Sequence, residues 1–77
     1  MNTEQVICYP NPNNGHFSIS VPSSLIGNNI EIRDINGKLL RSFFVNDEWQ
    51  EINLNDLARG SYWLKIEGSK PIQIIKN

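Results

Sequence analysis

The sequence lacks the groups that a metal site or a nucleic-acid-binding surface requires. Its 77 residues include one cysteine, Cys8, so the chain can form neither an internal disulfide nor a cysteine-rich metal site. The seven lysines and arginines are spread along the chain and the net charge is −1, so there is no basic patch for phosphate groups. We therefore expect no cofactor, no bound metal and no nucleic-acid partner.

Long apolar runs are also missing. The longest is only a few residues, far below the roughly 20 that span a bilayer, and no basic-then-apolar leader precedes the first apolar segment. The chain as given is therefore predicted to be neither a membrane span nor a signal peptide. Export stays open, because a C-terminal part of a longer precursor would carry its leader at the other end.

The chain does contain many short apolar segments with turn residues between them. In residues 16–21, Phe17, Ile19 and Val21 alternate with polar residues, which indicates a strand with one buried face. The predicted strands are residues 6–9, 16–21, 30–34, 38–45, 48–54, 61–67 and 70–76. About seven short strands without helical periodicity predict an all-β fold, a small antiparallel immunoglobulin-like β-sandwich.

The turn residues predict how these strands are joined. Asn36-Gly37 predicts a hairpin, because both residues tolerate positive φ. Residues 55–60 are too few for more than one helical turn, and Pro71 near the start of the last strand favours a position at a sheet edge. Residues 1–5 are predicted to be linker, and residues 6–77 to be a single domain.

Catalytic groups are few. The one possible thiol–imidazole pair is Cys8 with His16, but the alternation places Cys8 inward and His16 outward. Cys8 is therefore interpreted as a small buried apolar residue. Asp34 begins a segment like the start of a calcium loop, but the other acids of that motif are missing, so a turn role is favoured. The acids are scattered and the chain is too short to wall a cleft, so we expect neither enzyme activity nor a small-molecule substrate.

Two tryptophans have two possible roles. Alternation places Trp63 outward, and it places Trp49 outward as well if Ile52 and Leu54 point inward. Exposed indoles could stack on sugar rings or anchor a protein partner. The favoured interpretation is that each covers the rim of a thin core, because large aromatic side chains are highly buried on average. The first possibility supports an alternative function, an immunoglobulin-like binding or spacer module of a secreted protein, for carbohydrate for example.

Four segments resemble a known family. They are YPNPNNGHFSI (residues 9–19), IEIRDINGKLL (30–40), LNDLARGSYWLKI (54–66) and IQIIKN (72–77). In this order, they resemble the C-terminal sorting domain of proteins exported by the type IX secretion system. That family shows Tyr-Pro-Asn-Pro-x-x-Gly, Asp-x-x-Gly-Lys, Leu-x-x-Gly-x-Tyr and a short apolar–Lys ending. The matching residues are Tyr9, Pro10, Asn11, Pro12, Gly15, Asp34, Gly37, Lys38, Leu57, Gly60, Tyr62, Ile74, Ile75 and Lys76.

The resemblance implies an export signal. In such precursors an N-terminal leader directs the chain into the periplasm, and the outer-membrane secretion apparatus then recognises the C-terminal domain. A sortase-like cysteine protease commonly removes the domain, which leaves the fused N-terminal passenger at the cell surface or outside the cell. The catalytic cysteine belongs to that protease, so the resemblance gives Cys8 no such role.

Most of the matching residues also have a structural reason. The prolines and glycines set backbone geometry, and Leu57 and Tyr62 are expected in the core. The last strand differs, because it is apolar, lies at an edge and ends in a cation. We hypothesise that residues 70–77 are the part most directly recognised, by addition of a partner strand to unpaired backbone groups.

Overall fold

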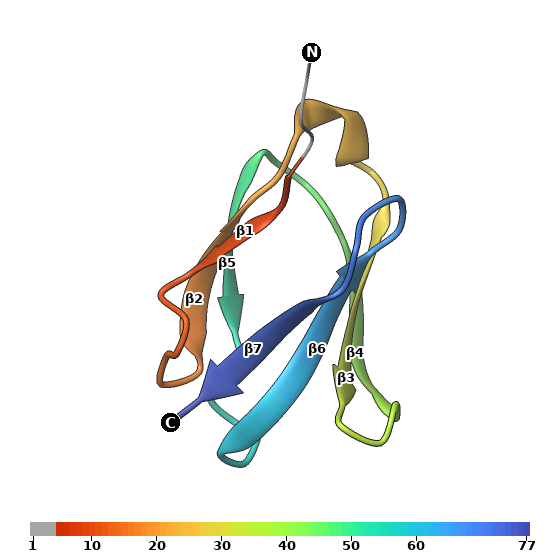
Figure 1. Ribbon diagram of the computed structural model, residues 1–77. Helices are drawn as coiled ribbons and strands as arrows, with labels where there is room; N and C mark the ends of the chain where they lie inside the picture. Colours follow the sequence, from red (N-terminus) through yellow and green to blue (C-terminus); the bar gives the residue numbers. More distant parts are fainter. Residues whose placement is uncertain (1–4) are drawn as a thin grey trace.

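The computed structural model describes residues 5–77, which form two antiparallel β-sheets (Figure 1). The strands are β1 (Ile7–Tyr9), β2 (His16–Ser20), β3 (Asn29–Asp34), β4 (Leu39–Phe44), β5 (Trp49–Asn53), β6 (Gly60–Ile66) and β7 (Ile72–Lys76), with a 3-10 turn, η1 (Ser23–Leu25), between β2 and β3. The predicted all-β fold with seven strands is confirmed. Residues 1–4 of the predicted linker lie outside the described residues, and the predicted domain boundaries stay predictions.

The order of the strands makes the sandwich immunoglobulin-like. One sheet has the order β1-β2-β5 and the other the order β4-β3-β6-β7. The chain leaves the first sheet after β2, forms the β3–β4 hairpin in the second, returns for β5 and ends with the β6–β7 hairpin. Such crossings between two sheets are the Greek-key connections of immunoglobulin-like sandwiches. The predicted architecture is therefore confirmed, including the edge position of the last strand.

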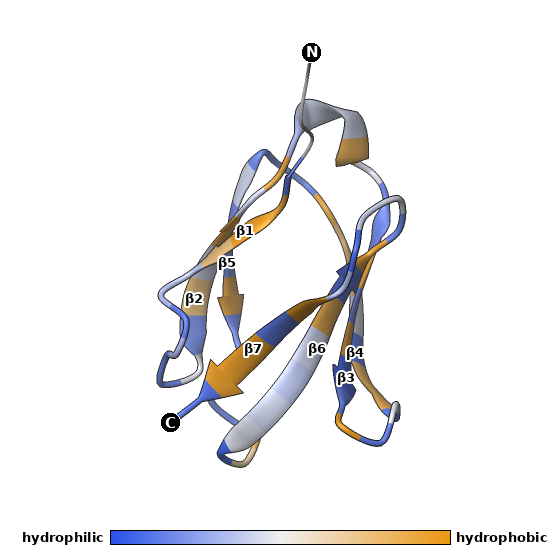
Figure 2. Ribbon diagram, viewed as in Figure 1, coloured by the Kyte–Doolittle hydropathy of each residue, from blue (hydrophilic) through white to orange (hydrophobic). Residues whose placement is uncertain are grey.

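The core consists of alternate residues from both sheets. In β2, Phe17 and Ile19 are buried, whereas Ser18 and Ser20 lie on the opposite face and are partly exposed. Figure 2 shows the same alternation as orange and blue bands along the strands. The other side chains with almost no exposed area are Ile30, Ile32, Val45, Leu54, Leu64, Ile66 and Ile74. Each such burial contributes about 1.5–3 kcal/mol, so a core this thin depends on every strand.

The β3–β4 hairpin forms where Asn36-Gly37 predicted it, but only the glycine has positive φ. Gly37 has a φ of +85°, and no non-glycine residue among residues 5–77 has a positive φ. The carboxylate of Asp34 holds the turn, because its Oδ1 accepts hydrogen bonds from the backbone N of Asn36 (2.9 Å) and of Lys38 (2.9 Å). A carboxylate that satisfies nearby backbone donors is a common turn device, and this is the role predicted for Asp34.

Residues 57–62 form a tyrosine corner. Tyr62 is buried near the start of β6, and its hydroxyl donates a hydrogen bond to the carbonyl of Ala58. A tyrosine at this position of an immunoglobulin-like sandwich ties the connection between the sheets to the following strand. Leu57 packs against the core in the same turn. The Leu-x-x-Gly-x-Tyr segment therefore has a structural role in this protein.

Candidate functional site

The four segments that carry the sequence motifs lie at one end of the sandwich (Figure 1). Residues 9–15 precede β2, residues 34–38 follow β3, residues 54–60 lead into β6, and residues 74–77 end the chain at β7. Strands that begin at one end of an antiparallel sheet alternate with strands that finish there, and this brings the four segments to the same end. We call this end of the molecule the motif end.

Residues 9–15 carry the chain from the three-stranded sheet to the edge of the four-stranded sheet. Tyr9 still belongs to β1, whereas Asn13 forms an isolated parallel bridge with Lys76 of β7. The backbone N of Asn13 donates to the carbonyl of Ile75 (2.9 Å), and its carbonyl accepts from the backbone N of Asn77 (2.7 Å). The first motif therefore binds directly to the last one.

Asn11 also hydrogen-bonds to the backbone of β7, next to Asn13. Its side-chain Nδ2 donates to the carbonyl of Gln73 (2.7 Å), and its Oδ1 accepts from the backbone N of Ile75 (2.9 Å). A side-chain amide offers a donor and an acceptor as a peptide group does, so Asn11 replaces a residue of a neighbouring strand. The prediction that this strand offers unpaired backbone groups is therefore wrong for these positions, because residues 11–13 already occupy them.

Lys76 points into the protein. The residue is only 8% exposed, although it is charged and next to the last residue of the chain. Its Nζ donates to the carbonyls of Leu54 (3.0 Å), Asn55 (3.1 Å) and Leu57. These carbonyls belong to the connection between β5 and β6, so the ammonium joins the end of β7 to that connection. The cation at the end of the hypothesised recognition segment, residues 70–77, is thus bound within the fold.

Asn13 is a residue of this site that the sequence motifs did not single out. It is 5% exposed, its Nδ2 donates to the carbonyl of Pro10 (3.0 Å), and its Oδ1 accepts from the backbone N of Gly15 (2.8 Å). An asparagine that accepts a bond from the residue two positions later is a recognised turn device, so the Asn-x-Gly spacing was the available signal. Gly15 in turn accepts a bond from the backbone N of Leu54 (2.6 Å).

The motif residues divide into two groups by exposure. Those buried or packed against the core are Gly15, Leu57, Tyr62, Ile74 and Lys76. The exposed ones are Tyr9, Pro10, Asn11, Pro12, Gly37, Lys38, Gly60 and Ile75, while Asp34 is half-buried. Ile75 and Lys76 are neighbours that point in opposite directions, because successive side chains of a strand alternate between its two faces.

The two tryptophans lie on different sheets. Trp49 is on β5 of the three-stranded sheet and is 52% exposed, and Trp63 is on β6 of the four-stranded sheet and is 39% exposed. The ring of Trp49 packs edge-on against Tyr9 of β1, with 5.2 Å between the ring centroids. The outward faces of the two sheets point to opposite sides of the sandwich, so the indoles do not form one binding platform.

Cys8 and His16 do not form a catalytic pair. Cys8 packs against the core, and burial raises the pKa of its thiol to about 11. His16 is exposed, and its Nε2 lies 3.1 Å from Oε1 of Glu51. The part of the chain that the structure describes has no group of three or more His, Cys, Asp or Glu side chains that could hold a metal ion. Among the same residues, no helix is long and apolar enough to cross a membrane.

Cys8 is expected to react slowly with alkylating reagents. A pKa of about 11 instead of 9.0 lowers the thiolate fraction at pH 8 by about a hundredfold. Alkylation by iodoacetamide should therefore be at least that much slower in the folded protein than in urea, as measured by mass spectrometry over time. The folded-state pKa is raised, so the folded protein holds this proton more tightly, and ionisation should lower stability only as the pH rises from about 9 to 11. Equal alkylation rates in buffer and in urea would contradict the buried position of the thiol.

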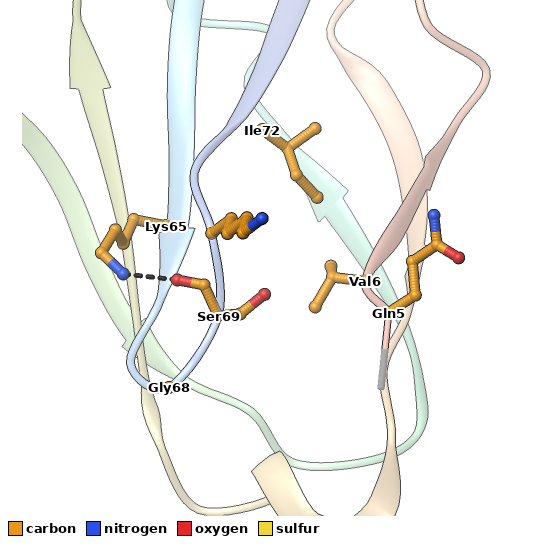
Figure 3. A pocket seen from close by; sticks show the side chains of 7 residues that line it. Gln5, Val6, Lys65, Gly68, Ser69 and Ile72 are labelled. Carbon is orange, nitrogen blue, oxygen red and sulfur yellow. Dashed lines mark hydrogen bonds between the residues drawn. The ribbon is translucent and has the colours of Figure 1, made fainter. Parts of the chain in front are cut away.

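A hollow of about 600 Å³ lies between the beginning of β1 and the β6–β7 hairpin (Figure 3). Val6 and Ile72 contribute its apolar side chains, and the Nζ of Lys65 donates to the carbonyl of Ser69. Its described lining contains no carboxylate, imidazole or thiol that could activate Ser69. This hollow has the form of an open seam between the sheets.

Comparison with known proteins gives a family match and a relative. The model of one protein family, described as the secretion system C-terminal sorting domain, matches residues 7–77. A protein named Beta-agarase A from Zobellia galactanivorans is 32% identical over 68 residues, which cover 88% of this chain and 13% of the agarase. The chain therefore spans only a small part of the length of this relative.

Proposed function

Because the chain belongs to the family of secretion system C-terminal sorting domains, which are sorting signals of the type IX secretion system, we propose that it directs a fused passenger across the outer membrane. The observation that carries this proposal is that all four motif segments meet at one end of the sandwich. A receptor could therefore recognise them together as one surface. Proteins with this domain are exported, and the family is not an enzyme family.

The passenger is the part of the precursor that has an activity of its own. The passenger is fused on the N-terminal side, because the family's domain is C-terminal, and the 13% of the agarase that this chain covers agrees with a passenger much longer than the domain. The route runs through the periplasm to the outer-membrane apparatus and ends at the cell surface or outside the cell. A sortase-like cysteine protease then removes the sorting domain, and that partner supplies the catalytic cysteine.

The exposed motif residues are the proposed contacts of the secretion apparatus. Gly15 and Lys76 are buried and act on the fold, so their effect on export is indirect. Pro12, Lys38 and Ile75 are exposed at the same end, and Ile75 keeps 39% of its surface open to a partner. Large apolar side chains and cations at the surface of a domain are frequent anchors of protein interfaces. This proposal replaces strand addition to residues 73–77.

Export of a reporter tests the proposed function. The domain would be fused to the C-terminus of an inert reporter with an N-terminal leader, in a host that has the type IX machinery. We expect the reporter at the cell surface or in the medium, and an unrelated small β-sandwich in place of the domain should leave it in the periplasm. Removal of the domain should shorten the exported reporter, as seen by blotting with a separate tag on each part. A reporter that stays in the periplasm with a folded sorting domain would refute the proposal.

The neighbouring residues Ile75 and Lys76 provide the matched pair for this assay. Ile75→Ser changes an exposed side chain, so it should leave the unfolding midpoint nearly unchanged and reduce export. Lys76→Met should lower the unfolding midpoint, and export should fall with the folded fraction. If Ile75→Ser, Pro12→Ala and Lys38→Ala all export the reporter as the parent does, the proposed contact surface is wrong even where the domain works as a signal.

A further inference from the structure

A second hollow lies on the outward face of the four-stranded sheet, next to the β3–β4 turn of the motif end, and the proposed export function does not account for it. It measures about 570 Å³ and is open to the solvent. The residues that line it are Glu31, Arg33, Asp34, Ile35, Asn36, Gly37, Trp63, Lys65 and Pro71. We call it the Trp63 hollow, because the indole is its largest apolar group. Trp63 of β6 and Arg33 of β3 are direct cross-strand partners, so their side chains leave the same face of the sheet at neighbouring positions.

The guanidinium of Arg33 is held in place by the protein itself. Its Nε and Nη2 both donate to Oε1 of Glu31, at 3.1 and 2.9 Å. Its Nη1 donates to the carbonyl of Gly37 in the hairpin, at 2.8 Å. A side chain fixed by three hydrogen bonds loses little further conformational freedom when a ligand binds. The hollow therefore has a preorganised polar wall beside an exposed aromatic ring.

The charges in the Trp63 hollow balance. Two carboxylates, Glu31 and Asp34, face two cations, Arg33 and Lys65. A strongly charged ligand of either sign would meet repulsion from one of these pairs, whereas a neutral ligand with many hydroxyl groups could use both as donors and acceptors. The negative face of an indole also attracts the weakly positive C–H groups of a sugar ring.

We propose that the Trp63 hollow binds a neutral saccharide of one or two sugar rings. Trp63 supplies the stacking surface, and Arg33 and Glu31 hydrogen-bond the sugar hydroxyls. The site borders the motif end at Asp34 and Gly37. Its proposed ligand contacts, Trp63, Arg33 and Glu31, are not among the proposed contacts for the secretion apparatus, so they give the sorting domain an affinity for carbohydrate that is independent of export. Trp49 takes no part, because it packs on Tyr9 on the other side of the sandwich.

A peptide is a weaker candidate for the same hollow. β3 lies between β4 and β6, and β6 lies between β3 and β7, so both strands that floor the hollow have neighbours on either side. Strand addition needs an unpaired edge, and these central strands do not provide one. A peptide could therefore bind here only through its side chains, and binding of a peptide in place of a sugar is the alternative outcome of the test.

The two indole groups make the test internally controlled. The ¹H–¹⁵N spectrum of the chain would be recorded during titration with cellobiose, maltose or lactose at millimolar concentrations. We expect a saturable shift of the Trp63 Nε1–H signal with at least one of these sugars, and no comparable shift of the Trp49 signal. Trp63→Ala should weaken the affinity by about tenfold or more, as measured from the backbone signals of β3. Trp49→Ala should leave the affinity unchanged.

A second variant separates loss of binding from loss of fold. Arg33→Lys keeps the charge but removes the fork of donors, so it should weaken binding severalfold while the spectrum keeps the dispersion of a folded protein. The proposal is overturned if none of the three sugars shifts the Trp63 signal. It is equally overturned if Trp49 and Trp63 respond alike, or if a proline-rich peptide shifts Trp63 where the sugars do not. None of these results depends on whether the domain directs export.

Discussion

Gly15→Ala is expected to lower the free energy of unfolding by about 3 kcal/mol. Gly15 has a φ of +109°, which side-chain-bearing residues rarely adopt. A Cβ at this position would also lie 2.8 Å from Oδ1 of Asn55 and 2.8 Å from Cε of Lys76. Relief of these contacts would move both the connection before β6 and the side chain that anchors the end of β7. Urea unfolding monitored by tryptophan fluorescence measures the change.

Gly37→Ala is the matched control for this experiment. Gly37 has a φ of +85°, but a Cβ there would meet nothing within 4 Å. The backbone penalty is therefore shared by the two variants, and steric conflict is present only at Gly15. Gly37→Ala should cost about 1 kcal/mol, so the difference between the variants reports the packing at the motif end. Equal losses in the two variants would show that this packing contributes nothing to stability.

Lys76→Met is expected to destabilise the protein by about 2–3 kcal/mol, although the residue is next to the end of the chain. Methionine keeps an unbranched apolar stem of similar length, and it removes the ammonium that donates to Leu54, Asn55 and Leu57. The three carbonyls would lose a charge-assisted partner in a partly buried place. For a domain whose total stability is about 5–10 kcal/mol, this is a large fraction.

Lys70→Met is the control for the loss of a lysine. Lys70 is exposed in the turn between β6 and β7, at the opposite end of β7 from Lys76, so its replacement should change stability by less than about 0.5 kcal/mol. Hydrogen exchange should distinguish the two variants further, because Lys76→Met is expected to release the backbone N of Ile75 and of Asn77 from protection. Full protection of both amides in Lys76→Met would mean that the ammonium does not hold this strand.

Both predictions concern the same arrangement, in which the first motif and the last one stabilise each other. Residues 11–13 cover the edge of β7, and Gly15 allows the chain to pass close to Lys76. An edge strand with free backbone groups invites pairing with other chains. The hydrogen bonds from residues 11–13 to residues 73–77 therefore protect an apolar terminal strand from pairing with other chains.

Much of the fold could be predicted because alternation is a local property. Phe17 and Ile19, or Leu64 and Ile66, show the period of two that a half-buried strand imposes on its own residues. The hairpin at Gly37 was predictable for the same reason, since a turn depends on four or five consecutive residues. The fine geometry of that turn was not, because the φ of Asn36 also depends on how the bulged strands on either side align.

The candidate site was predictable only in part. The sequence identified the positions of the motifs, but it did not predict that Lys76 bonds to three carbonyls. Ile72, Ile74 and Lys76 are alternate residues of one strand and therefore lie on the same face. That alternation alone would have placed its stem inward. The three carbonyls that bind Lys76 lie 19 to 22 residues earlier in the chain, and the two backbone groups that bind Asn11 lie 62 and 64 residues later. Local sequence patterns do not predict contacts over such separations.

The sequence by itself determined the number of strands, the side of each that is buried, and the turns that join neighbours, because each of these depends on residues close together in the chain. Only the tertiary structure decided that β1 and β7 belong to different sheets and that residues 11–13 cross between them. Strand order is a choice among long-range pairings that have similar local patterns. The covered edge of β7, the enclosed ammonium of Lys76 and the separation of Trp49 from Trp63 all follow from that choice.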